Sequence, residues 1–298
     1  MGADRLFTDL RGNFRRGDIV TRLLYINIGV YLLVAVVGLV MTLFRLPWSS
    51  YVGYLELPAW PERFLRQPWS LLTYMFMHAG LLHLVFNMLW LFWFGRLFLM
   101  FFSSKHLRGL YLLGGICGGL LYMLAYNVFP YFEDAVYRSS LVGASASVLA
   151  IVFAVGIGQP DYEVQFVLIG RVKMRYVALG VLVLDLLLMT SDNAGGHIAH
   201  IGGALSGWWF AASIQRGRDI TAWINRILDA VTGGSGRRQA RRPKMKVKQG
   251  GGTGKKADAQ QSKGPDMDRI LDKLRKSGYS SLTDEEKRSL FDGGNNRR

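Results

Sequence analysis

The sequence predicts an all-α polytopic membrane protein, with six membrane-spanning helices in a bundle and a small helical tail in the cytoplasm. Half of the 298 residues are hydrophobic, 19% are charged, and the mean hydropathy is +0.18. A soluble domain of this size carries more charge on its surface. The apolar residues are concentrated between residues 20 and 215. This distribution excludes a single soluble globule and a disordered chain, and the single cysteine, Cys117, excludes an internal disulfide.

Six apolar runs approach the length that crosses a bilayer, which is about 20 residues of helix. They cover residues 22–44, 81–103, 107–129, 141–158, 176–190 and 197–214. The fifth run is short, and we expect it to cross among longer neighbours. Together the runs predict a membrane domain over residues 22–215, preceded by a cytoplasmic N-terminal segment of residues 1–21.

The Lys and Arg residues set the orientation of the spans, because loops rich in them are retained in the cytoplasm. Eleven precede the first span or follow spans two and four, whereas four lie in the opposite connections. We therefore expect the N- and C-termini in the cytoplasm. No transit peptide is evident, which favours the inner (cell) membrane of a bacterium over an organelle.

The tail after residue 215 is basic, with 21 Lys and Arg against ten Asp and Glu, so +11 of the net charge of +15 lies there. Nucleic-acid binding is one interpretation. We prefer a cytoplasmic tail attracted to anionic lipid, and expect no nucleic acid as partner. The composition predicts a basic flexible linker over residues 216–265 and a helical hairpin over residues 266–298 that binds a cytoplasmic partner. Thr283 and Glu286 form a capping box for its second helix.

Polar residues inside apolar spans are costly, so each is a functional hypothesis. Four of them, His83, Asn87, Ser145 and His200, lie in the first two turns of spans two, four and six. These spans all run from outside to inside, so at 1.5 Å per residue the four share a depth of about 5–10 Å below the outer surface. The shared depth predicts one polar site that opens outward to water.

The residue types in this layer predict nucleophilic catalysis. A serine hydroxyl such as that of Ser145 needs a base within reach, and a neutral histidine such as His200 is the usual one. Their helices must approach closely, which small residues allow. Gly143 lies beside the serine, and Gly203 and Gly207 share one face of the last span.

His83 and Asn87 are four residues apart and therefore share one helical face. Attack on an amide creates an oxyanion, which needs fixed donors. Both side chains can donate, and the backbone N–H of Ser145 adds a third donor. We expect His78 to brace the preceding loop through a hydrogen bond rather than to take part in catalysis.

These motifs resemble those of the rhomboid intramembrane serine proteases. The matching pieces are His78-x4-His83-x3-Asn87, the GASA sequence of residues 143–146, and Ala199-His200-x2-Gly203-x3-Gly207. The resemblance implies a rhomboid-like bundle of six helices, a Ser145–His200 dyad and oxyanion donors at His83 and Asn87. It also implies cleavage of single-span or polytopic membrane proteins near the outer face of the lipid bilayer, with neither a cofactor nor a metal.

Three positions depart from the family pattern. Ser70 follows Trp69 where an arginine is usual, Leu99 replaces an acidic residue, and Leu149 replaces an aromatic residue one turn after the serine. No reacting atom is lost. These departures leave open a catalytically inactive rhomboid-like protein that binds or chaperones membrane proteins.

The histidines also permit a metal site or a metal transporter. His197 and His200 are three residues apart, and His83 or Asp185 can complete a set of zinc ligands. Asp185 can instead be a third catalytic residue that orients His200. We expect it to be a structural aspartate, because it lies well inside span five, nearer the middle of the bilayer than the serine layer.

Overall fold

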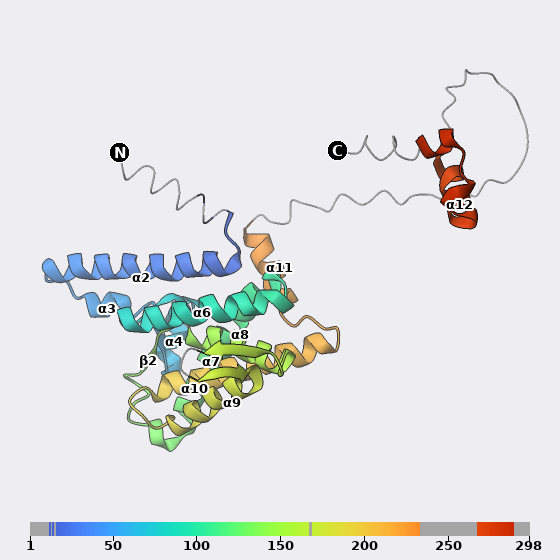
Figure 1. The fold of residues 1–298 in the computed structure, drawn as a ribbon. Coiled ribbons are helices and arrows are strands. Elements are labelled where there is room, and N and C mark those ends of the chain that lie inside the picture. Colours follow the sequence, from blue (N-terminus) through green and yellow to red (C-terminus); the bar gives the residue numbers. More distant parts are fainter. Residues whose placement is uncertain (1–11, 13, 15, 167–168, 233–266, 289–298) are drawn as a thin grey trace, which may run out of the picture. The chain divides into compact units, whose positions relative to one another are not determined.

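A computed structural model describes residues 12, 14, 16–166, 169–232 and 267–288 (Figure 1). The chain divides into two compact units, residues 1–240 and residues 241–298. The first unit is a helical bundle and contains every predicted site residue.

Within the described residues, six helices of the first unit occupy the positions of the predicted spans. They are α2 (Ile19–Leu43), α6 (Leu81–Phe101), α7 (Ser104–Val128), α8 (Ser145–Gly158), α9 (Met174–Leu187) and α10 (Ala194–Gln215). By length and apolarity, α2, α6 and α7 can each cross a membrane, and α8 is a shorter apolar helix. The helical fold is thus confirmed, whereas the count of six spans stays a prediction.

Helix α8 is the centre of the bundle and packs against α6, α7, α9 and α10. Its residues 146–156 form one continuous buried run. The sequence of α8 is apolar on all sides, as is usual for a helix without a solvent face. Ser145, at its first position, is therefore held by the most enclosed element of the bundle.

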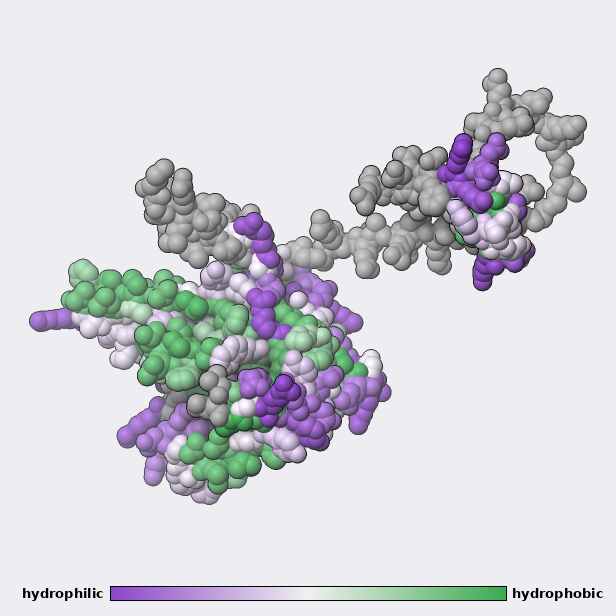
Figure 2. Space-filling model, viewed as in Figure 1, coloured by the Kyte–Doolittle hydropathy of each residue, from purple (hydrophilic) through white to green (hydrophobic). Residues whose placement is uncertain are grey.

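Helix α2 lies at the periphery, packed against α6, with most of its apolar side chains exposed. The surface over α2 is accordingly green in Figure 2. Such a large exposed apolar surface indicates contact with a partner or with lipid. A buried polar contact ties α2 to the core: the Asn27 side chain donates to the Tyr111 hydroxyl of α7 at 3.1 Å.

The connection between α2 and α6 is structured and holds the segment that leads into α8. It comprises α3 (Trp48–Val52), β1 (Leu57–Pro58), α4 (Pro61–Arg66), α5 (Ser70–Thr73) and the 3-10 turn η1 (Tyr74–Phe76). Strand β1 pairs antiparallel with β2 (Ser140–Leu141), which follows the turn η2 (Pro130–Phe132). The Gly143 N–H donates to the Tyr74 carbonyl at 2.9 Å. These backbone bonds fix the approach to Ser145.

A hairpin of β3 (Glu163–Phe166) and β4 (Gly170–Lys173) joins α8 to α9. Next to it, the Asp161 carboxylate accepts from Arg175 at 2.7 Å and from Lys173 at 3.1 Å. The hydrogen bond from Lys173 and the charges of both cations lower the pKa of Asp161. This polar connection lies at the opposite end of α8 from Ser145.

Helix α11 (Ala222–Val231) lies in the segment expected to be a flexible linker, so that prediction was wrong for these residues. The helix packs against α7, where Arg108 donates to Asn225 at 2.6 Å and pairs with Asp229. The hydrogen bond from Arg108 lowers the pKa of Asp229. The prediction rested on the basic composition of the whole tail and so missed a short amphipathic stretch that packs against α7 as a helix.

The second unit contains α12 (Met267–Ser277) and the 3-10 turn η4 (Tyr279–Ser281), joined at Gly278. The predicted capping box is present: the Thr283 N–H donates to the Glu286 carboxylate at 2.8 Å. Glu286 also pairs with Lys273 of α12 at 2.8 Å. The predicted linker beyond residue 232 and the end of the hairpin lie outside the described residues.

Candidate active site

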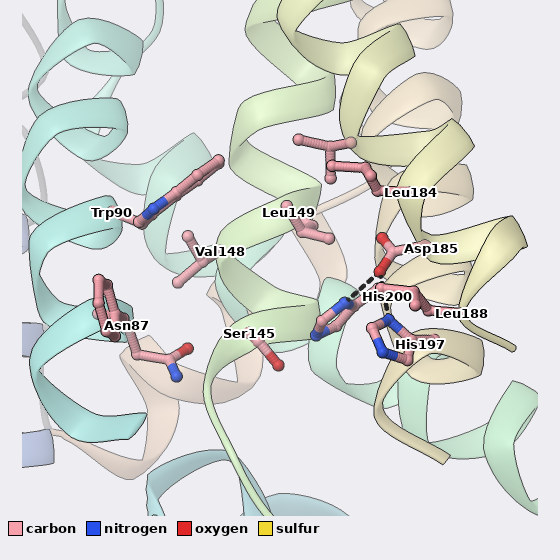
Figure 3. Close-up of a pocket in the computed structure, with 12 residues that line it drawn as sticks. Asn87, Trp90, Ser145, Val148, Leu149, Leu184, Asp185, Leu188, His197 and His200 are labelled. Carbon is pink, nitrogen blue, oxygen red and sulfur yellow. Dashed lines mark hydrogen bonds and ion pairs between the residues drawn. The ribbon is translucent and has the colours of Figure 1, made fainter. Parts of the chain in front are cut away.

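A cavity of about 330 Å³ lies between α6, α8, α9 and α10, and both Ser145 and His200 line it (Figure 3). Most of its wall is apolar: Phe86, Trp90, Val148, Leu149, Val181, Leu184 and Leu188. Its polar wall consists of Asn87, Ser145, Asp185, His197 and His200. The structure thus brings together at one cavity residues that lie up to 114 positions apart in the sequence.

Ser145 is the first residue of α8, so its backbone N–H is one of the helix donors that lack an intrahelical acceptor. The turn before it depends on Gly143, whose φ of +130° is unfavourable for any other residue. A Cβ on Gly143 would lie 2.9 Å from the His83 ring and 3.6 Å from the Ser145 hydroxyl oxygen. Glycine at position 143 therefore leaves room for the His83 ring and the Ser145 hydroxyl side by side.

His200 reaches this layer because α10 and α8 touch backbone to backbone. A Cβ on Gly203 would overlap the Ala146 carbonyl, and a Cβ on Gly207 would overlap the Ala150 carbonyl. His200 lies one turn before Gly203 and so faces the start of α8. In Figure 3 the Ser145 hydroxyl is directed toward the side of the cavity that holds His200.

Ser145 and His200 are not hydrogen-bonded to each other in the described part of the chain, where His200 is bonded to Asp185. In free enzymes such bonds are often long and tighten only when substrate binds. The two side chains line the same cavity.

Asp185 is the polar residue whose placement differs most from the prediction. Its carboxylate oxygen Oδ1 accepts from Nδ1 of His200 and from Nδ1 of His197, both at 2.8 Å (Figure 3). The expected depth was wrong because α9 ends at Leu187, two residues after Asp185. The turn into α10 then sets Asp185 beside the first turns of that helix, at the level of His200.

Asn87 and His83 lie near Ser145 in different ways. Asn87 lines the cavity, and one of its amide N–H groups donates to the His83 carbonyl at 2.8 Å. The His83 ring occupies the space that a Cβ on Gly143 would enter, and its Nδ1 accepts from the Ala79 N–H at 3.4 Å. In a neutral imidazole this acceptor role leaves the proton on Nε2. A Cβ added to Gly143 would lie 3.0 Å from the Nε2 atom of His83.

His78 supports the site by packing. It is 8% exposed, and the Phe76 backbone acts on its ring as a hydrogen-bond partner. The bracing of the loop by this bond stays a prediction. The His78 ring also meets the His83 ring edge-on, with 5.3 Å between the ring centroids.

Two of the three departures from the expected pattern lie at informative positions. Leu149 lines the cavity and is 6% exposed, so no aromatic ring of α8 stacks on His200 there. Ser70 is fully buried, and its hydroxyl has no partner among the described residues. Leu99 packs against the bundle core.

Comparisons with known proteins point to one family. A model of the Rhomboid domain matches residues 65–216, which include α6 to α10 and every residue of the cavity wall. RHOMBOID-like protein 7 of Arabidopsis thaliana is 31% identical over 150 residues, 48% of this chain and 42% of that protein. The match thus spans less than half of that relative's length.

Proposed function

The chain belongs to the rhomboid family, whose members are multi-pass membrane proteins, and from this premise we propose that it is an intramembrane serine protease. The observation that carries the proposal is the shared cavity of Ser145 and His200, with Asp185 hydrogen-bonded to the far side of the His200 ring. Nucleophile, base and orienting group are the parts that acyl transfer by a serine requires.

In the proposed reaction, the Ser145 oxygen attacks the scissile carbonyl while His200 Nε2 takes the hydroxyl proton. His200 Nδ1–H donates to Asp185, which keeps the Nε2 lone pair facing the serine. The tetrahedral intermediate collapses when His200 returns the proton to the leaving amine. Water then attacks the acyl-enzyme, again with His200 as base, and releases the new carboxylate.

The developing oxyanion needs donors near the start of α8. The free N–H of Ser145, the Nε2–H of His83 and the second amide N–H of Asn87 are the candidates. The hydrogen bond from Ala79 to His83 Nδ1 supports the His83 tautomer that donates. No metal and no cofactor are needed for this chemistry.

The cavity favours membrane-anchored substrates. Its apolar wall is built from α6, α8 and α9, and α9 carries several exposed apolar side chains, including Leu184 at 59%. We expect single-span or polytopic membrane proteins, cut where small or helix-breaking residues expose a carbonyl near the outer face of the bilayer. From the charge bias described above, we expect both termini in the cytoplasm.

A serine-reactive fluorophosphonate tests the proposal on the purified full chain. Wild type is expected to be labelled, Ser145→Ala to remain unlabelled, and His200→Ala to be labelled far more slowly. Ser147→Ala is the matched control, because Ser147 lies two residues on in α8 and is fully buried; its labelling is expected to equal wild type. A folded wild-type protein that stays unlabelled would favour a rhomboid-like binder or chaperone.

A further inference from the structure

One carboxylate oxygen of the site serves two imidazole rings. Asp185 Oδ1 accepts from the Nδ1 atoms of His197 and His200, and the side chains are only 8%, 15% and 18% exposed. Orienting a catalytic base requires one of these contacts. His197 donates to the same oxygen, lines the same cavity, and has no role in the acyl transfer proposed above.

The three side chains present the donor set of a zinc site. Their ligand atoms lie within 4.8 Å of one another. In tetrahedral zinc sites, Zn–N and Zn–O distances of about 2.1 Å put neighbouring donor atoms about 3.4 Å apart. The two 2.8 Å contacts must therefore open by about half an ångström for zinc to bind. Imidazole and carboxylate together suit zinc-like ions, whereas Mg²⁺ prefers oxygen ligands and keeps its waters.

We propose that Asp185, His197 and His200 bind a divalent transition-metal ion of the zinc class, with a cavity water as fourth ligand. Binding at this place acts on catalysis through the tautomer of His200. Without metal, the proton sits on Nδ1 and the Nε2 lone pair is the base. With metal on Nδ1, the proton of the neutral ring moves to Nε2, and that nitrogen can no longer accept the Ser145 proton. The metal is thus a reversible inhibitor.

The inhibition rests on the proposed protease function, but the binding does not, so the two are measured separately. Binding is followed by calorimetry on the full-length Ser145→Ala protein, freed of any histidine tag, with zinc chloride as titrant and magnesium chloride as negative control. We expect one zinc per chain and no binding of magnesium.

Two histidine variants locate the ion. His197→Asn keeps a side-chain donor for Asp185 but removes an imidazole, and it is expected to weaken zinc binding at least about tenfold, the lower end of what outer-shell changes alone cost. His106→Asn is the matched control, because His106 lies at the other end of the bundle. There its Nε2 atom is 3.6 Å from the Asp219 carboxylate. Its zinc affinity is expected to equal that of the parent.

Inhibition is measured as the cleavage rate of a transmembrane substrate at rising zinc, relative to each variant's own rate without metal. Zinc should inhibit wild type and His106→Asn alike, a chelator should restore the rate, and His197→Asn should need at least about ten times more zinc.

Failure of the Ser145→Ala protein to bind zinc, or undiminished binding in His197→Asn, would overturn the site. Zinc bound through His197 without loss of cleavage would overturn the inhibition. A chain that binds zinc through His197 but cleaves nothing would support the site and contradict the protease.

Discussion

At the scale of single residues, we expect Asp185 to orient the proposed catalytic base, a role for which the rhomboid pattern offers an aromatic residue on α8. An aromatic side chain one turn after the serine can stack on the catalytic histidine, but Leu149 stands there in this chain. The 2.8 Å hydrogen bond from His200 to Asp185 fixes the ring from the opposite side instead. A charged partner orients an imidazole more strictly than a stacking contact, because it also selects the tautomer.

Asp185→Asn is expected to lower kcat by about 10²- to 10⁴-fold, because an amide that donates to Nδ1 imposes the wrong tautomer on His200. KM should change little, since the apolar wall of the cavity is untouched. Initial rates over a range of substrate concentrations separate the two constants. Leu186→Ala is the control on the same helix, with a side chain 51% exposed and outside the cavity. A kcat within twofold of wild type in Asp185→Asn would remove Asp185 from the mechanism.

Gly143→Ala tests the turn before the serine. Any side chain at a φ of +130° is strained, at a cost of about 1–3 kcal/mol, and its Cβ would also press on the His83 ring. We expect a lower thermal midpoint and slower fluorophosphonate labelling, by up to the roughly 10²- to 10³-fold that the loss of one oxyanion donor costs. Gly180→Ala in α9 is the matched control, because a Cβ there meets nothing within 4 Å. Equal labelling of the two variants would show that the turn does not position the site.

At the scale of elements, the site depends on how closely α10 and α8 pack. Gly203 and Gly207 bring the α10 backbone onto the carbonyls of α8, and Gly202 does the same against α7, where a Cβ would lie 2.7 Å from the Cys117 carbonyl. Small residues at such spacing are the usual means of close helix packing inside membranes. His200 is therefore positioned by the seam between two helices as well as by its own hydrogen bond.

Gly207→Ala should disturb that seam without touching the cavity. The added methyl group overlaps the Ala150 carbonyl, and overpacking of this kind costs about 1–3 kcal/mol. The expected result is a lower thermal midpoint in detergent together with slower cleavage, as α10 shifts and moves His200 away from Ser145. Gly29→Ala in α2, where a Cβ has open space, should leave both quantities unchanged. Wild-type stability in Gly207→Ala would mean that the helices are not in contact there.

Helix boundaries show what hydropathy can and cannot predict. The second span was expected at 81–103 and α6 covers Leu81–Phe101, because its apolar run begins and ends with the helix. The fourth was expected from residue 141, but α8 begins at Ser145. Residues 141–144 are apolar too, yet they form β2 and the Gly143 turn, and apolarity does not distinguish an extended segment from a helix.

The sequence could predict those residues of the candidate site whose placement follows from their depth along a membrane-spanning helix. His83, Asn87, Ser145 and His200 could be grouped because each lies near the start of its span. Asp185 could be offered only as an alternative, because its neighbours depend on where α9 ends and on how the turn of residues 188–193 returns the chain. An acidic residue close to the end of one helix and a histidine near the start of the next were the available signal.

At the scale of the whole molecule, the proposed reaction requires water but would take place within an apolar bundle. The central helix α8 is buried along its length, the peripheral α2 and α9 expose apolar side chains, and the polar groups of the cavity gather at one end of α8. This arrangement separates the lipid-facing surface from the reacting groups. It fits a protein that acts on other membrane proteins from within the bilayer.

The most direct test of this account is cleavage of a purified single-span substrate by the purified full chain in liposomes, with fragments identified by mass spectrometry. The wild-type protein should cut the substrate near the outer end of its span, and Ser145→Ala should give no product under the same conditions. Product formed by Ser145→Ala at the wild-type rate would contradict the assignment of Ser145 as the nucleophile.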